Sequence, residues 1–125
     1  MKNIIIQGVY IVGMHHWGRR SLEVNEVHFC SRDRSNRFDS NAVAVYSDAN
    51  LTNTVAYLQR KDAAVIAGIL QYAGRGKCYL KAKTEPEKFN KFKGPMQRCN
   101  IGFKCDDNDV ASLRILLSDY AIKIF

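Results

Sequence analysis

The stretch from Arg32 to Leu58 constrains the fold most, because it places a polar loop directly before a core strand. The run from Ala42 to Tyr46 alternates small and β-branched residues, which is typical of a buried strand. The loop before it is rich in Asn and Asp, whose side chains bond their own backbone. Binding residues are often carried on loops that a rigid scaffold positions. We therefore expect a functional site on this loop.

Short apolar runs with the same alternation recur along the chain, each followed by residues that favour a turn. The predicted strands cover residues 3–13, 22–31, 41–47, 54–58, 77–84, 96–105 and, at the end of the chain, 119–125. Helical spacing marks residues 60–72 and 106–117 instead, and residues 85–95 are predicted to form a charged loop. This order indicates a mostly β fold with two helices (α+β). An OB-like β-barrel of about six strands is one closed arrangement of such elements, and it is the one that we expect.

Length and composition indicate one folded unit. The 125 residues include 46% hydrophobic side chains and only two prolines, which is enough apolar material for one core. No apolar run approaches the roughly 20 residues that a membrane span needs. The start of the chain also lacks the features of a signal peptide. We therefore expect a single domain over residues 1–125 in a soluble intracellular protein.

The sequence predicts no metal, cofactor or disulfide. The four cysteines are dispersed, and without a secretory signal we expect free thiols. Cys99 and Cys105 would lie far apart on a straight strand, unlike the closely spaced pairs of structural zinc sites. The glycine-rich phosphate-binding motifs of nucleotide-dependent enzymes are also missing from the sequence.

The positive charge is concentrated in one segment. Residues 75–104 hold nine basic residues against two acidic ones, which accounts for the whole formal net charge of +7. Lys81 and Lys83 alternate with apolar positions, so both lysines face outward on the predicted strand. Aromatic residues lie among the basic ones, which favours a nucleic-acid contact over a solvated surface alone. We therefore predict that these two lysines follow a nucleic-acid backbone.

A second group of candidates follows the first predicted strand. Gly13 and Gly18 bracket a loop that contains His15, His16 and Trp17, the only tryptophan. The indole either caps the core or stacks on a base, and the sequence leaves both interpretations open. Adjacent histidines point to opposite faces of an extended chain, so they are poorly placed to share one metal ion.

The central stretch also carries a motif. The pattern R-[DE]-x-x-N-x-[YF]-D-x-N-A-[IV]-x-V is matched without a gap by Arg32, Asp33, Asn36, Phe38, Asp39, Asn41, Ala42, Val43 and Val45. With Gly13 and Trp17 in the first loop, and Tyr57 and Leu58 before the first predicted helix, the chain resembles the HIRAN domain over about residues 3–117. The resemblance implies an OB-like barrel with a pocket for the free 3′ end of single-stranded DNA. In such a pocket aromatic side chains stack on the terminal bases and an aspartate contacts the 3′-hydroxyl.

The resemblance and the chemistry of the side chains together suggest roles for the candidates. Asp39 would meet the 3′-hydroxyl, while Arg32, Arg60 and Lys61 can meet phosphates. Core packing is the alternative for the aromatic rings, and turn formation is the alternative for the polar loop residues. The predicted DNA-binding residues are His15, His16, Trp17, Arg32, Asn36, Phe38, Asp39, Asn41, Tyr57, Arg60, Lys61, Lys81 and Lys83.

Other functions stay open at this point. An enzyme would need a nucleophile beside a base, and the sequence offers only His28 with Cys30, or His15 with a distant cysteine, so we predict no enzymatic activity. A protein-interaction module would present the basic face to an acidic partner. A general single-stranded nucleic-acid binder would ignore strand ends. The expected partner is the 3′ end of single-stranded DNA in repair or replication-fork processing, with a helicase or nuclease as a further candidate; the oligomeric state is not predicted.

Overall fold

The computed structural model describes residues 1–72, 78–86, 88–90 and 94–125. Two α-helices and three short 3-10 helices accompany the strands; they are α1 (Arg60–Ile69), α2 (Val110–Leu116), η1 (Met14–Trp17), η2 (Leu70–Tyr72) and η4 (Asp107–Asp109). The strands are β1 (Lys2–Val12), β2 (Val27–Arg32), β3 (Val43–Tyr46), β4 (Thr54–Leu58), β5 (Cys78–Ala82), β6 (Lys88–Asn90), β7 (Gly94–Cys105) and β8 (Ala121–Ile124).

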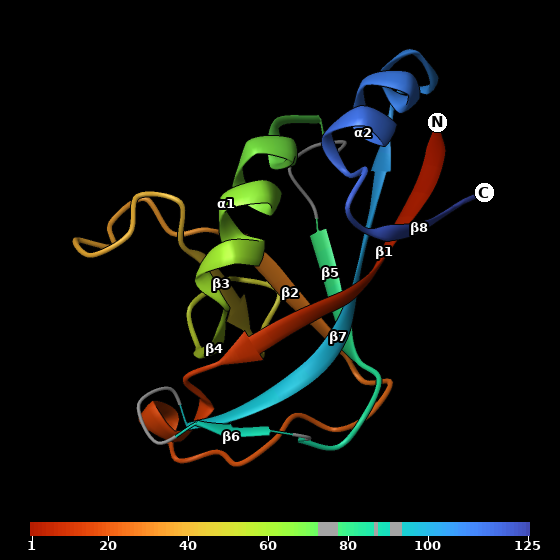
Figure 1. Ribbon diagram of the computed structural model, residues 1–125. Coiled ribbons are helices and arrows are strands. Elements are labelled where there is room, and N and C mark those ends of the chain that lie inside the picture. The colour runs from red at the N-terminus through yellow and green to blue at the C-terminus, as the bar shows by residue number, and fades with distance from the viewer. Residues whose placement is uncertain (73–77, 87, 91–93) are drawn as a thin grey trace.

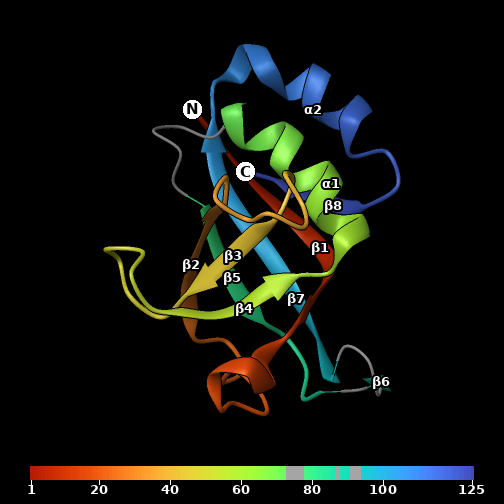
Figure 2. The same cartoon turned by 90° about the vertical axis from the view of Figure 1, so that its left-hand side faces the viewer.

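Six of these strands close into an antiparallel barrel, as the sequence predicts. Their order is β7-β5-β2-β3-β4-β1, and β1 pairs again with β7 to complete the circle. The short strands β6 and β8 lie outside this circle, on β7 and β1 respectively. Figures 1 and 2 show the two long strands, β1 and β7, running side by side along the molecule. Closure satisfies the backbone groups that an open sheet edge would expose.

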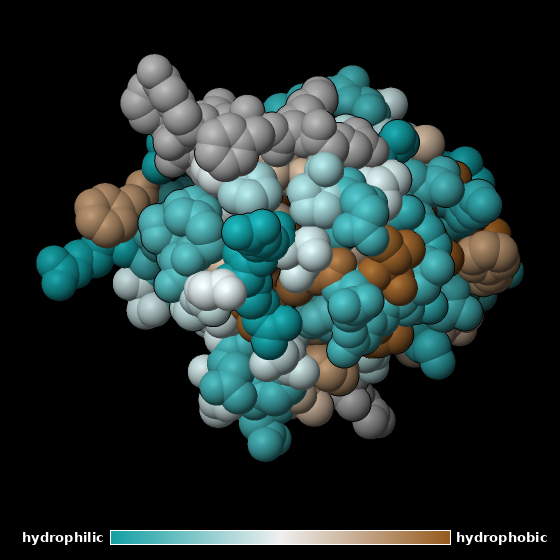
Figure 3. Space-filling view, turned by 90° about the horizontal axis from the view of Figure 1, so that it is seen from below, coloured by the Kyte–Doolittle hydropathy of each residue, from teal (hydrophilic) through white to brown (hydrophobic). Residues whose placement is uncertain are grey.

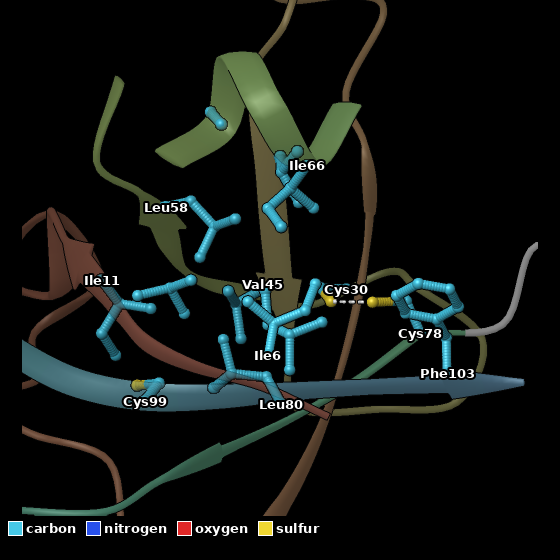
Figure 4. Packing of buried hydrophobic residues seen from close by; sticks show 14 of the residues in the cluster. Ile6, Ile11, Cys30, Val45, Leu58, Ile66, Cys78, Leu80, Cys99 and Phe103 are labelled. Carbon is cyan, nitrogen blue, oxygen red and sulfur yellow. Dashed lines mark hydrogen bonds between the residues drawn. The ribbon is translucent and has the colours of Figure 1, made fainter. Parts of the chain in front are cut away.

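The barrel encloses one apolar core, part of which Figure 4 shows. Inward positions on the strands alternate with outward ones, so Ile4 and Ile6 on β1 meet Leu80 on β5 and Ile101 on β7 in the same cluster. Helix α1 covers the core from above in Figure 1 and buries Ile66 in it. Each fully buried side chain of this size contributes about 1.5–3 kcal/mol relative to leaving it exposed.

A β-bulge interrupts the pairing of the two long strands, β1 and β7. The β1–β7 register shifts between Gln7 and Val9, and Gly8 between them has φ +82°. Glycine suits this left-handed conformation because it lacks a Cβ atom. The bulge lets β1 remain paired with β7 on one side while it also pairs with β4 near its end.

Two predicted elements differ from the structure. The predicted strand over 22–31 begins only at Val27, because a turn at Glu23–Glu26 with Asn25 at φ 65° interrupts it; Val24 keeps one isolated bridge. The prediction of a loop over 85–95 is wrong for residues 88–90, which form β6 against the first residues of β7. The charged composition of this segment predicts a loop, but β7 begins as early as Gly94, so its first residues are available to form backbone hydrogen bonds with residues 88–90.

The predicted helices and the terminal strand are present with shorter bounds. The first helix is α-helical to Ile69 and then tightens into η2, and the second starts with η4, where the Asp106 carboxylate accepts a hydrogen bond from the Asn108 backbone at 2.8 Å. In the described ranges, no helix has both the length and the apolar character that crossing a membrane requires.

Candidate nucleic-acid interface

A cleft of about 690 Å³ opens where the end of β1, the junction of β4 with α1, and the loop of residues 33–42 meet. Pairing of β1 with β4 brings these segments together, since Val12 lies opposite Tyr57. The residues that line the cleft are Val12, Gly13, His16, Asn36, Phe38, Asp39, Ala42, Tyr57, Leu58, Gln59 and Arg60. Six of the thirteen predicted DNA-binding residues are among them. The tertiary structure therefore gathers in one cleft candidates that are far apart in the chain.

The loop on one wall of the cleft is held by its own side chains. The Asn36 Oδ1 accepts hydrogen bonds from the backbone N–H groups of Phe38, at 2.9 Å, and Asp39, at 3.0 Å. The Asp39 Oδ1 in turn accepts one from the Asn41 backbone at 2.9 Å. From α1, the Arg60 guanidinium donates to the Phe38 carbonyl at 3.0 Å. These bonds define the loop backbone without any ligand.

This well-bonded loop presents Phe38 to solvent. The residue is 89% exposed, so the alternative of core packing does not apply to its ring. Burying a phenylalanine side chain would stabilise the fold by about 1.5–3 kcal/mol. The ring stays exposed instead, while hydrogen bonds hold both the N–H and the carbonyl of Phe38 in place. An exposed aromatic ring on the lip of a cleft is suited to a stacking contact.

Asp39 forms the turn and also faces the cleft. Its Oδ1 is used by the turn, whereas its Oδ2 lies 3.8 Å from the Arg60 Nε, a distance at which the charges attract but no hydrogen bond forms. The side chain of Asp39 is 21% exposed. The carboxylate can therefore support the loop with one oxygen and receive a donor from a ligand with the other.

The aromatic side chains of His16 and Tyr57 also line the cleft, and Trp17 contacts both of them without lining it. The rings of Trp17 and Tyr57 lie 5.6 Å apart between centroids at an angle of 39°, and the Trp17 ring also meets His16 edge-on at 6.1 Å. Trp17 is 39% exposed, so part of its ring is open to solvent. His15 stacks on His16 at 4.1 Å but does not line the cleft. Its ring packs on Gly94 of β7, where an added Cβ would collide with it.

Tyr57 is oriented by Asp33, a motif residue that was not among the predicted site residues. The Tyr57 hydroxyl donates to the Asp33 Oδ2 at 2.8 Å. Burial and this carboxylate raise the pKa of Tyr57 to about 12, so the phenol stays protonated and keeps donating. Hydrogen bonds from Ser35 and Tyr57 lower the pKa of Asp33. Its place in the motif beside Arg32 was the available signal for a supporting role.

Several predicted residues lie elsewhere. Arg32 donates to the Ser40 carbonyl at 3.1 Å and to the Asn41 Oδ1 at 3.3 Å, so these side chains brace the loop and do not line the cleft. Lys81 is exposed on β5, and Lys83 just beyond that strand donates to Asn25. Of the basic segment, Arg75, Lys77, Lys91 and Lys93 lie outside the described residues.

Lys61 lines a separate cleft of about 630 Å³, with Arg98 and Tyr120 among its other lining residues. At its base the buried Asp62 accepts hydrogen bonds from the Tyr10 backbone, the Gln59 amide and the Tyr120 hydroxyl. Gln59 lines both clefts, and sequence reasoning missed it. Its position between a strand and a helix was the only signal, because the side chain carries no charge.

The nucleophiles considered for catalysis are not accessible to a substrate, because all four cysteines are buried. His28 and Cys30 are buried, and the Cys30 thiol lies 3.1 Å from the Cys78 thiol, as Figure 4 shows. Burial and the neighbouring thiol raise the pKa of Cys78 well above that of an ordinary cysteine, which keeps it from acting as a thiolate. Within the part of the chain that the structure describes, no three metal-ligating side chains come together.

Comparison with known proteins supports the resemblance. The crystal structure of the HIRAN domain of human HLTF is similar with a TM-score of 0.67 and 19% sequence identity, over 94% of this chain and 91% of that chain. A Lactobacillus plantarum protein of known structure has a TM-score of 0.55 and 15% identity, over 83% of this chain and 100% of its own. A search of curated proteins found no match. The HIRAN family model matches residues 5–105, and the chain therefore belongs to the HIRAN domain family, a family of generally nucleic-acid-binding modules.

Proposed function

We propose that the cleft binds the free 3′ end of single-stranded DNA. The observation that carries this proposal is the pairing of an 89% exposed Phe38 with a cleft-facing Asp39 on one hydrogen-bonded loop. Terminal bases would stack on Phe38 and on the rings of Tyr57 and His16, both of which contact Trp17. Stacking of this kind contributes about 1–3 kcal/mol per base and tolerates any sequence.

The charges around the cleft support the same ligand. Arg60 borders the cleft beside Asp39, and Arg34 and Arg37 are exposed on the loop. These cations would meet the phosphates that precede the terminal nucleotide. A carboxylate among them would repel phosphate, unless it meets a donor such as a hydroxyl. Among the sugar and phosphate groups at this end of a DNA strand, the 3′-hydroxyl is the one that can donate to Asp39 Oδ2.

End preference follows from that contact. A hydrogen bond with a charged partner contributes about 1.5–3 kcal/mol net, and a 3′-phosphate would instead place like charge against Asp39. The cleft should therefore prefer a 3′-hydroxyl over a 3′-phosphate by about tenfold to a hundredfold. A domain with this preference would serve DNA repair or replication-fork processing inside the cell, beside a helicase or nuclease that acts on the same strand.

Binding to matched oligonucleotides tests the proposal. Fluorescence anisotropy would compare one thymidine oligonucleotide with a 3′-hydroxyl, a 3′-phosphate and a 3′-blocking group, each labelled at the 5′ end. We expect tightest binding to the free hydroxyl, and Phe38→Ala should weaken it about fivefold or more because one stacking surface is lost. The exposed ring makes this variant safe for the fold, and its melting temperature provides the control.

The alternatives give different results in the same assay. Equal affinity for all three ends would refute end recognition and identify a general single-stranded nucleic-acid binder. Failure to bind any oligonucleotide at low salt, where phosphate contacts are strongest, would favour a protein-interaction module instead.

A further inference from the structure

A second surface with features suited to nucleic acid lies on the outer wall of the barrel. Strands β1, β7, β5 and β2 are consecutive neighbours in this wall, and none of them contains an acidic residue. Outward positions carry Lys81 on β5, and Arg98 and Lys104 on β7, all exposed. Because no carboxylate on these strands offsets the cations, the wall is complementary to a polyanion.

Strand register places an aromatic row across the same wall. Tyr79 on β5 pairs with Phe29 on β2 and with Gly102 on β7, and Gly102 pairs with Ile5 on β1. The Phe29 and Tyr79 rings are tilted against each other at 5.6 Å between centroids. Tyr79 is 39% exposed, so part of its ring can receive another ring.

A hollow of about 320 Å³ interrupts this row at Gly102. Its lining includes Tyr79, Ile5, Lys104 and Phe125, which is 63% exposed and held against β1 by two backbone hydrogen bonds with Asn3. The missing side chain of Gly102 leaves the space open between aromatic rings. The hollow is mostly apolar and open to solvent, as a site for the face of a base must be.

Lys104 lines the hollow, and Lys81 lies further along the wall on the other side of Tyr79 and Gly102. Lys81 lies two residues beyond Tyr79, and Lys104 lies two residues beyond Gly102 in the opposite direction, because the strands are antiparallel. Four residues of strand separate their levels by about 13 Å. Two phosphates on either side of an inserted base could therefore each meet a lysine.

We propose that this wall is a second binding site for single-stranded nucleic acid, at which a base enters the hollow between Tyr79 and Phe125 while Lys81 and Lys104 bind the backbone. The site needs no strand end, in contrast to the proposed 3′-end cleft. It gives a role to Lys81, which lies outside that cleft. A chain with both sites could hold the end of a strand and an internal segment.

A covalently closed circle of single-stranded thymidine DNA separates the two sites, because it has no 3′-hydroxyl. We expect the unmodified protein to bind the circle with an affinity that falls as salt rises. Gly102→Val should fill the hollow and weaken binding about fivefold to a hundredfold, in line with the loss of one stacked base. Lys81→Glu should weaken it similarly, whereas Phe38→Ala in the other cleft should leave it unchanged.

Controls for folding and charge are available in the chain. At Gly102 an added Cβ meets no atom closer than 3.8 Å and φ is not positive, and valine favours strands, so Gly102→Val should fold with an unchanged or higher melting temperature. Lys81→Glu provides a second test that leaves the core intact. Arg114→Glu on the exposed side of α2 makes the same charge change away from the wall and should not affect binding.

Three results would overturn the proposal. The first is a circle that the protein does not bind. The second is a circle whose binding is lost in Phe38→Ala and unaffected by the wall variants, which would assign it to the cleft. Binding of an acidic peptide but not the circle to the wall would identify a protein partner. A failure of the proposed 3′-end recognition can be told apart from a failure of the second site. It would appear as equal affinity for linear strands with a 3′-hydroxyl and with a 3′-phosphate.

Discussion

Replacing Asp39 by asparagine tests the proposed 3′-end recognition most directly. The change removes one negative charge and keeps the size of the side chain. Asparagine still offers an Oδ1 to accept the hydrogen bond from the Asn41 backbone, which Asp39 accepts at 2.9 Å. The loop should therefore keep its form, at a cost in unfolding free energy of about 1 kcal/mol or less.

The effect on ligand preference should be much larger than the effect on stability. In the unmodified protein the Oδ2 faces Arg60 at 3.8 Å and would accept the 3′-hydroxyl. Losing a charge-assisted hydrogen bond costs about 1.5–3 kcal/mol, so the preference for a hydroxyl over a phosphate should fall by about tenfold to a hundredfold. The variant should also bind a 3′-phosphorylated strand more tightly, because Arg60 is no longer paired with a carboxylate.

Anisotropy titrations with 3′-hydroxyl and 3′-phosphate strands at one salt concentration would measure both effects, with thermal melts as the control for folding. Glu23→Gln, at an exposed position that does not line the cleft, removes one negative charge in the same way and offers a matched control. If Asp39→Asn keeps the full end preference, Asp39 acts only in the turn and the reasoning is refuted.

Three further predictions concern the stability of the fold. The pKa of Tyr57 is about 12 in the folded protein and 10 in the unfolded chain, so the stability that this group adds is present below pH 10 and is lost as the pH rises towards 12. The melting temperature of Tyr57→Phe should therefore fall less than that of the unmodified protein over this pH range. An equal fall would contradict the hydrogen bond from Tyr57 to Asp33. Gly94→Ala should lower the melting temperature, since φ is +71° and the new Cβ collides with His15; an unchanged melt would refute this packing. Ile66→Ala should cost about 2–5 kcal/mol in denaturant unfolding, and a cost below about 1 kcal/mol would exclude a close-packed site.

The sequence was informative where local periodicity decides the outcome. On β5 the alternation of Cys78, Leu80 and Ala82 with exposed residues follows directly from the apolar pattern, because successive strand residues face opposite sides. The loop of residues 33–42 was also predictable, since Asn and Asp there bond nearby backbone groups in the structure. Both are contacts between neighbours in the chain.

The sequence was less informative where distant partners decide. Strand β6 forms because β7 extends far enough to pair with it, and its charged composition alone predicted a loop. The sequence also could not predict that the Phe38 side chain is exposed, because an aromatic residue in a β-rich chain can either pack in the core or face solvent.

The sequence by itself indicated a mostly β fold with two helices, for which a barrel of about six strands was one closed arrangement, and it carried the motif of the family. Only the tertiary structure decided which candidates share a site. Pairing of Val12 with Tyr57 brings His16 to the loop of Phe38, while the register of β5 with β7 turns Lys81 onto a different wall. The physical reason is that alternation is set by adjacent residues, whereas the lining of a cleft depends on the register between strands that lie far apart in the chain.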